Sequence, residues 1–313
     1  MIDADDAVHW WGLVLAPALL AAYAYAAAAG SAARTARASG APAAAALAAP
    51  AREAAGLLLR RRRTVPGADT LLWRVGIASV PVAAVMAVLV VPVGGRAIAD
   101  LSIGVVWFNA MEVLLWGGMW LAGWGANSVW GLVGGYRYLI QGLSHELPHM
   151  FALTTAAVGA GSLRVGDIAA AQQDVWFVLV MPAAFVVYLV SALAMSFWPP
   201  FDQPVGRDLS GGAAAEPSGP DRLVLLAGRH AMLAAAAAMA VPLFLGGGAG
   251  PLLPGWAWSL LKAAAVLALL VWAGGRVPAV RMDRFAEVGW VVLLPLVLLQ
   301  ALAVSVFVVA GWM

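Results

Sequence analysis

Long uninterrupted apolar runs constrain this chain more than any other feature of its sequence. Eight runs are each long enough, at about 20 residues, for a helix to cross a hydrocarbon core of roughly 30 Å. They cover residues 8–30, 71–92, 104–125, 131–160, 174–198, 222–247, 256–275 and 288–311. Only 11% of the residues are charged, against about 25% in soluble domains. We predict an all-α, polytopic membrane protein with eight transmembrane helices that form a single domain, residues 1–313.

The basic residues predict the orientation of these helices. They concentrate in the first, fifth and seventh connections, while the second and fourth hold one each and the sixth none. Because positive charge accumulates on the cytoplasmic side, we expect the odd connections there and both termini on the other side. Residues 31–70 then form a cytoplasmic loop with a possible surface helix, and residues 199–221 form a second one. The run Arg60–Arg63 is expected at the anionic lipid surface, with a partner-docking role as the alternative.

The N-terminal segment bears on signal-peptide cleavage, and the absence of cysteine limits the redox groups that this chain can hold. The first residues, MIDADDAVHW, lack a basic n-region, so we expect the first apolar run to be retained rather than cleaved. The sequence contains no cysteine, which excludes a disulfide framework and thiolate-held iron–sulfur clusters in this chain. If electrons are involved, other subunits carry them.

The stretch Arg137–His149, RYLIQGLSHELPH, places a polar arc inside an otherwise apolar helix. Arg137, Gln141, His145 and His149 step around the helix in 40° increments, with Glu146 about 180° from Arg137. Ionisable groups at membrane depth are costly and normally face a bundle interior, so we interpret this arc as a functional site.

Two other charged residues lie within apolar runs. Glu112 is either a member of a proton relay or a neutral acid bonded to a neighbouring helix. Lys262 lies near the non-cytoplasmic end of its helix, where its ammonium group can extend to the surface or face inward.

One interpretation of the central stretch is a zinc site. His145-Glu146-Leu147-Pro148-His149 fits the pattern H-E-x-x-H, in which two histidines chelate zinc and the glutamate acts as base. This pattern would indicate an intramembrane metalloprotease. However, Pro148 removes a backbone donor from the turn that must hold both ligands, and a third zinc ligand is not evident beyond Asp202.

A second interpretation rests on resemblance. From residue 99 on, the chain resembles the membrane subunit that joins the two arms of respiratory complex I, known as the H-type subunit in bacteria and as subunit 1 in mitochondria. The resemblance is carried, in order, by ADLSIGVVWF (99–108), AGWGANSVWGLVGGYR (122–137), SHELP (144–148), AGSLRVGDI (160–168), PPFDQP (199–204), EPSG (216–219), GPLLPGWAWSLLKAA (250–264) and RMDRFAEVGWVVLLPL (281–296). In that family Ser144, Glu146 and Pro148 match the pattern, so the two histidines complete a zinc motif by coincidence.

The resemblance implies a multi-pass protein of the bacterial inner membrane in a proton-translocating NADH:quinone oxidoreductase. The chain would bind no cofactor or metal of its own and no nucleic acid. Quinone would be the substrate, in a chamber formed with peripheral subunits, and the iron–sulfur clusters and flavin would belong to partners. Isolated, the chain would not catalyse a reaction. The same fold serves as the membrane anchor of formate hydrogenlyase-type hydrogenases, and a plain scaffold is a further alternative.

Site residues follow from the same resemblance. Glu146 would be the buried carboxylate of the path from the chamber into the membrane, with Arg137 as its neighbouring charge. Asp202 and Glu216 would belong to the chamber loop. Proton-relay candidates are Glu112, His145, Asp283 and Lys262. Two loops depart from the family pattern: the first keeps only its basic character, and after Pro204 only Asp208 and Glu216 remain of several acids.

Overall fold

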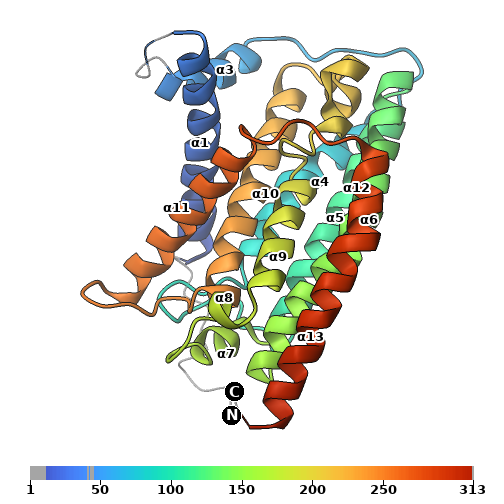
Figure 1. Cartoon of the computed structure of the whole chain (residues 1–313). Coiled ribbons are helices and arrows are strands. Elements are labelled where there is room, and N and C mark those ends of the chain that lie inside the picture. Colours follow the sequence, from blue (N-terminus) through green and yellow to red (C-terminus); the bar gives the residue numbers. More distant parts are fainter. Residues whose placement is uncertain (1–11, 41, 43–45, 312–313) are drawn as a thin grey trace, which may run out of the picture.

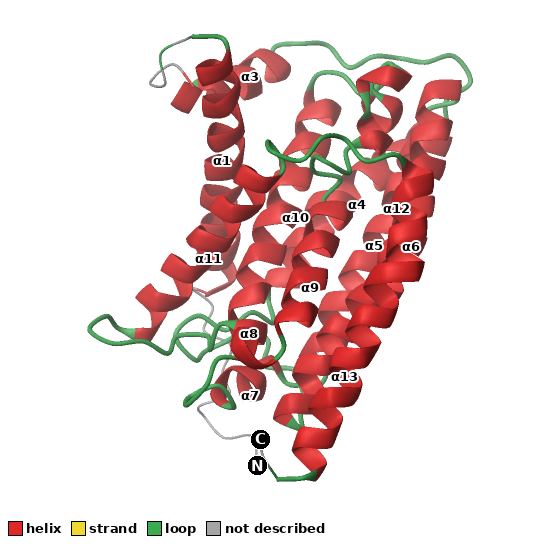
Figure 2. Cartoon of the chain, viewed as in Figure 1, coloured by secondary structure: helices red, strands yellow, loops and turns green. Residues whose placement is uncertain are grey.

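The computed structural model describes residues 12–40, 42 and 46–311, and these form a bundle of helices joined by loops (Figures 1 and 2). The long helices are α1 (Gly12–Ala38), α4 (Thr70–Val88), α5 (Gly104–Gly125), α6 (Val129–Ala160), α10 (Pro220–Phe244) and α11 (Gly255–Ala273). Shorter ones are α3 (Ala49–Leu58), α7 (Val165–Ala170), α8 (Phe177–Val180), α9 (Pro182–Met195), α12 (Met282–Val288) and α13 (Leu294–Val309). The acidic N-terminal residues, which led us to expect that the first apolar run is not cleaved, lie outside the described residues.

Six of the described helices are long and apolar enough to cross a membrane, as expected for a multi-pass membrane protein. They are α1, α4, α5, α10, α11 and the continuous segment Met282–Val309. Two predicted spans are not among the six. The fourth corresponds to α6, which has 32 residues but carries the polar arc. The fifth is divided into α8 and α9, because Pro182 has no N–H to continue a helix from Val180.

The helix boundaries agree with the predicted apolar runs to within a few residues, except at the end of α1 and at the start of the last segment, Met282–Val309, which begins six residues before the predicted run 288–311. Helix α1 continues to Ala38, so the first part of the predicted 31–70 loop is helical. Its sequence there is rich in alanine, the strongest helix former, which favours extending the helix over starting a loop. Within the same predicted loop, residues Ala49–Leu58 also form a helix, α3; its place at a lipid surface stays a prediction.

The core of the bundle lies around α10, where 61% of the residues in its apolar window are buried, against 17% for Met282–Val309. Helices α5 and α6 approach closely because a glycine lies at their crossing. A Cβ added to Gly123 would lie 2.4 Å from the carbonyl oxygen of Gly131 on α6. This close approach lies next to the short connection between α5 and α6, residues 126–128.

The long loops gather at the two ends of the bundle (Figure 1). At one end, the connection after α1 contacts the 199–221 loop through an ion pair between Arg63 and Glu216. The 199–221 loop also contacts the connection after α11, because the Val280 N–H donates to the Pro200 carbonyl. At the other end Gly94 N–H donates to the Ser259 hydroxyl. The arginine-rich connections therefore lie at the same end.

Candidate functional site

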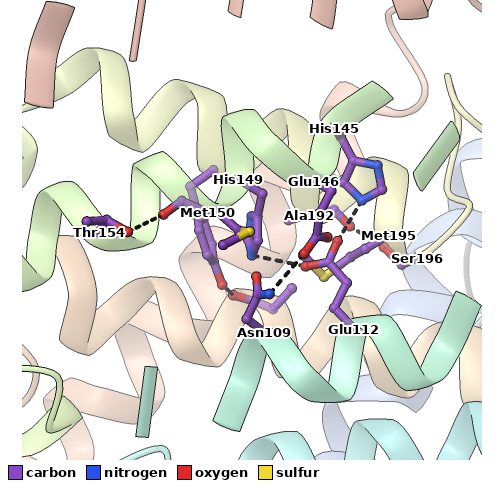
Figure 3. A network of polar contacts seen from close by, with 12 residues as sticks. Asn109, Glu112, His145, Glu146, His149, Met150, Thr154, Ala192, Met195 and Ser196 are labelled. Atoms are coloured by element: carbon purple, nitrogen blue, oxygen red, sulfur yellow. Dashed lines mark hydrogen bonds and ion pairs between the residues drawn. The ribbon is translucent and has the colours of Figure 1, made fainter. Parts of the chain in front are cut away.

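The candidate site lies where α5 and α6 face each other (Figure 3). Helix α5 supplies Asn109 and Glu112, which are three residues apart and so share one helix face. Helix α6 supplies His145, Glu146 and His149. We refer to these five residues as the buried polar cluster. Sequence reasoning missed Asn109, although its spacing from Glu112 was a usable signal.

Glu112 is the centre of the buried polar cluster. Its Oε1 lies 2.6 Å from Nε2 of His145, and its Oε2 lies 3.1 Å from Nε2 of His149. All three side chains are 0% exposed. A buried carboxylate is stable only when it is paired or protonated, and here two imidazoles face its two oxygens. The structure thus brings together two of the predicted relay residues, Glu112 and His145.

The hydrogen bonds of His145 fix how many protons the pair holds. Its Nδ1 lies 2.7 Å from the Gln141 carbonyl oxygen, which can only accept, so Nδ1 carries a hydrogen. The contact between Nε2 and Glu112 then contains one proton, placed either on the imidazole or on the carboxyl group. The pair is therefore arranged to exchange a single proton over 2.6 Å.

Aromatic rings surround both imidazoles. Those of Trp116 and Phe285 lie 6.5 and 6.4 Å from the His145 ring, centroid to centroid. Those of Phe108 and Tyr188 lie 6.3 and 5.3 Å from the His149 ring. These apolar faces exclude bulk water, which strengthens electrostatic interactions within the buried polar cluster.

Glu146 lies beside this cluster and is less buried than Glu112. Its Oε1 accepts a hydrogen bond of 2.9 Å from Nδ2 of Asn109, while its Oε2 is buried without a partner among the described residues. The two carboxyl groups are close enough for the charge on Glu112 to act on Glu146. They therefore compete for protons.

Pro148 lies within α6 between the two histidines and leaves the Ser144 carbonyl without its usual helical donor. Helix α6 nevertheless runs unbroken from Val129 to Ala160. The freed carbonyl faces Gly289, where an added Cβ would lie 2.1 Å from the Ser144 oxygen. Gly289 begins a π-helical segment, Gly289–Leu293, that joins α12 to α13. The last helix thus packs directly against the irregular turn of α6.

Arg137 does not pair with Glu146. Its Nη2 lies 2.9 Å from Oδ2 of Asp208, and its Nη1 donates to the Gln203 carbonyl at 3.2 Å. Arg137 and Glu146 are nine positions apart, which separates them by about 13 Å along the helix axis, on opposite faces. The hydrogen bond from Arg137 lowers the pKa of the Asp208 carboxyl group below its ordinary value.

Glu216 connects the two long loops to α6. Its carboxylate accepts from Nη1 of Arg63 at 2.9 Å and from the Ser128 hydroxyl at 3.0 Å. Arg62 forms a second ion pair with Asp221, at 3.2 Å. Two of the four arginines expected at the lipid surface are therefore paired within the chain. Both have half-exposed side chains, so each pair contributes at most about 1 kcal/mol.

Like Arg137 and Glu216, three further predicted site residues lie apart from the buried polar cluster. Asp283 is exposed and pairs with Arg281 at 3.1 Å. Lys262 donates to the carbonyls of Leu245, Gly247 and Ala249 at 2.6, 3.1 and 2.7 Å, beyond the end of α10. Its ammonium group therefore neither extends to the surface nor faces the cluster. Asp202 lies in the 199–221 loop, near enough to Arg229 for the two charges to interact.

A cavity of about 340 Å³ lies between the 199–221 loop and the start of α10. Three arginines line it, Arg207, Arg222 and Arg229, together with Ser210. The guanidinium of Arg229 also lies 5.0 Å from the Trp198 ring. We call this the arginine cavity. Sequence reasoning noted these arginines only as charges, because nothing in their spacing indicates that they converge.

The geometry does not favour the zinc-protease interpretation. Nε2 of His145 and Nε2 of His149 each face a different oxygen of Glu112, and Glu146 bonds to Asn109 instead of facing a shared metal position. Within residues 12–40, 42 and 46–311, no group of three or more histidine, aspartate or glutamate side chains could hold a metal ion.

Comparison with known proteins gives a consistent result. The profile of the NADH dehydrogenase family matches residues 10–305. The second H-type subunit of NADH-quinone oxidoreductase from Geobacter sulfurreducens is 36% identical over 257 residues, which cover 79% of this chain and 76% of that protein. The H-type subunit from Geobacillus kaustophilus is 35% identical over 263 residues, covering 82% of this chain and 78% of that protein. The chain therefore belongs to the NADH dehydrogenase family.

Proposed function

We propose that this chain is the membrane subunit of a proton-translocating NADH:quinone oxidoreductase complex, in which it couples quinone reduction to proton movement. The similar proteins from Geobacter sulfurreducens, Geobacter metallireducens and Geobacillus kaustophilus are all named as the H-type subunit of NADH-quinone oxidoreductase. These names favour the quinone branch of the fold over a hydrogenase anchor. The observation that carries the coupling role is the buried polar cluster between two membrane helices.

The proposed topology has eight crossings of a bacterial inner membrane. Helix α6 and the pair α8–α9 are the crossings added to the six apolar helices. The arginine-rich end of the bundle is then the cytoplasmic side, and both termini face the opposite side.

The quinone chamber is proposed at this arginine-rich end, where it would be completed by peripheral subunits. The arginine cavity supports this role, because guanidinium groups and Ser210 can donate hydrogen bonds to a quinone oxygen as it gains negative charge. Asp202 and the Arg63–Glu216 pair belong to the same end and would shape the chamber. This chain supplies no redox centre in the proposal, so iron–sulfur clusters and flavin belong to partner subunits.

The coupling step is proposed to be a proton shift within the buried polar cluster. The Glu112–His145 pair shares one proton, and Glu146 feels the charge on Glu112. Negative charge arriving at the cytoplasmic side changes which group holds the proton, since interactions in a dry interior are weakly screened. Unpartnered buried atoms, including Asn109 Oδ1 and Glu146 Oε2, favour ordered water that would extend the route.

The test is Glu146→Gln in the assembled complex. We expect quinone reduction and assembly to persist while proton translocation, measured in sealed vesicles, falls to background. The matched control is Glu287→Gln, which neutralises an exposed carboxylate paired with Arg284. Proton translocation at the normal ratio in Glu146→Gln would refute the coupling role, and a complex that forms without this chain would refute its membership.

A further inference from the structure

A groove of about 520 Å³ runs between α1 and α11, away from the buried polar cluster and the arginine cavity. Small side chains create it: Ala22, Ala26 and Gly30 on α1, and Ala264 and Ala268 on α11. Its surface is almost entirely apolar. Both helices are among those able to cross a membrane, so the groove lies at the depth of lipid chains.

One end of this groove is cationic. Arg34 lines it, and its Nε and Nη1 are buried without a hydrogen-bond partner among the described residues. Only Nη2 donates, to the Ser31 hydroxyl at 3.4 Å. The guanidinium packs against the backbone of Gly275, where an added Cβ would lie 2.1 Å from Nη1. Two buried guanidinium nitrogens without acceptors are costly, which favours an acceptor at this position.

A second guanidinium lies at the same end. Arg276 is placed over Trp272, another groove residue, at 5.7 Å from its ring centroid. Within the part of the chain that the structure describes, neither Arg34 nor Arg276 forms an ion pair with a carboxylate. By contrast Arg62, Arg63 and Arg137, near the same end of the bundle, are each paired.

The position of these charges along the helices matches the membrane surface. Arg34 precedes the last residue of α1, Ala38, by four positions, which is about 6 Å. Arg276 follows the last residue of α11, Ala273, by three positions. The cationic end therefore lies at headgroup depth, while the apolar part of the groove extends toward the bilayer centre.

We propose that this groove binds one anionic phospholipid, with its phosphate on Arg34 and Arg276 and an acyl chain along the alanine- and glycine-lined surface. The charge decides between occupants, because an apolar helix or the apolar tail of a quinone leaves both guanidinium groups without an anion. The assignment depends on the chain spanning a membrane and not on the coupling role.

The experiment is native mass spectrometry of the full chain in mild detergent, with equal amounts of phosphatidylglycerol and phosphatidylcholine of the same acyl chains. We expect one phosphatidylglycerol to be retained preferentially. Arg34→Gln should reduce this retention about tenfold, since a hydrogen bond from a charged donor to a phosphate in the groove contributes roughly that factor, which a basic residue outside the groove does not supply. The matched control is Arg37→Gln, one turn along the same helix, exposed and outside the groove, which should change nothing.

A second pair of variants tests the apolar part without altering charge. Ala26→Leu fills the groove and should lower retention of both lipids, whereas Ala21→Leu, on the same helix but outside the groove, should not. Equal retention of the two lipids by the unaltered chain would overturn the proposal. Full retention of phosphatidylglycerol in both Arg34→Gln and Ala26→Leu would also overturn it. The same holds if an equal concentration of long-chain ubiquinone displaces the phospholipid.

Discussion

Replacing Glu112 tests whether the buried polar cluster is organised as the structure indicates. In Glu112→Leu, His145 loses its hydrogen-bond partner within an aromatic enclosure, and His149 loses only a nearby carboxylate oxygen to which it has no hydrogen bond. One buried polar group left unsatisfied costs about 1–3 kcal/mol, so the variant should lose about that much stability. That is a large fraction of the 5–15 kcal/mol typical of a folded domain.

Glu112→Gln separates structure from proton chemistry. Its amide can donate to Nε2 of His145, which is an acceptor in the tautomer that the Gln141 carbonyl imposes, and its oxygen can face His149. The contacts persist, but the group no longer exchanges a proton. We expect stability within about 1 kcal/mol of the unaltered chain and loss of proton translocation.

The assays are thermal unfolding of the purified chain in detergent, followed by its tryptophan fluorescence, and proton uptake by the assembled complex in sealed vesicles. At roughly 2–4 °C per kcal/mol for a chain of a few hundred residues, Glu112→Leu should unfold at least about 2 °C lower. A melting temperature unchanged in Glu112→Leu would refute the arrangement of the cluster. Normal proton uptake in Glu112→Gln would remove Glu112 from the route.

Three further perturbations have defined outcomes. Arg137 lowers the pKa of the Asp208 carboxyl group, so the stability from their pairing is fully present above the group's ordinary pKa of about 3.9 and is lost as the pH falls through the lower folded value. Hydrogen exchange at residues 206–211 should therefore rise as the pH falls through that value. Asp208→Asn should not show this pH dependence. Gly289→Ala should clash with the Ser144 carbonyl, and an unchanged melting temperature would contradict that packing. Lys262→Met should cost about 1–3 kcal/mol, measured by thermal unfolding.

The positions of the apolar helices could be predicted from the sequence because lipid imposes a length and a composition on each. The predicted run 104–125 corresponds residue for residue to α5, Gly104–Gly125. The fifth run differs because hydropathy does not register a break at Pro182, where the backbone lacks a donor. Helix α1 ends at Ala38, beyond the end of the predicted run at residue 30, because alanine is weakly apolar but strongly helix-forming.

The site could be predicted only in part. Spacing along α6 indicates which residues share a face, so the polar arc around Glu146 was visible. The rotation of one helix against another is set by tertiary packing and not by spacing along either helix, and it is this rotation that places two imidazoles beside Glu112. The same limit explains Arg137, whose partner Asp208 comes from a loop far along the chain. The functional roles of these residues stay predictions.

The three carbonyls that bond to Lys262 resemble the oxygen cage of a monovalent ion site, with the ammonium group in the place of the ion. An ion held by three neutral carbonyls exchanges with the surrounding electrolyte, whereas this positive charge is covalently attached. The turn after α10 should therefore keep its shape when sodium replaces potassium in the buffer. It should also keep its shape at low salt concentration, because the positive charge that the carbonyls bind belongs to Lys262 itself.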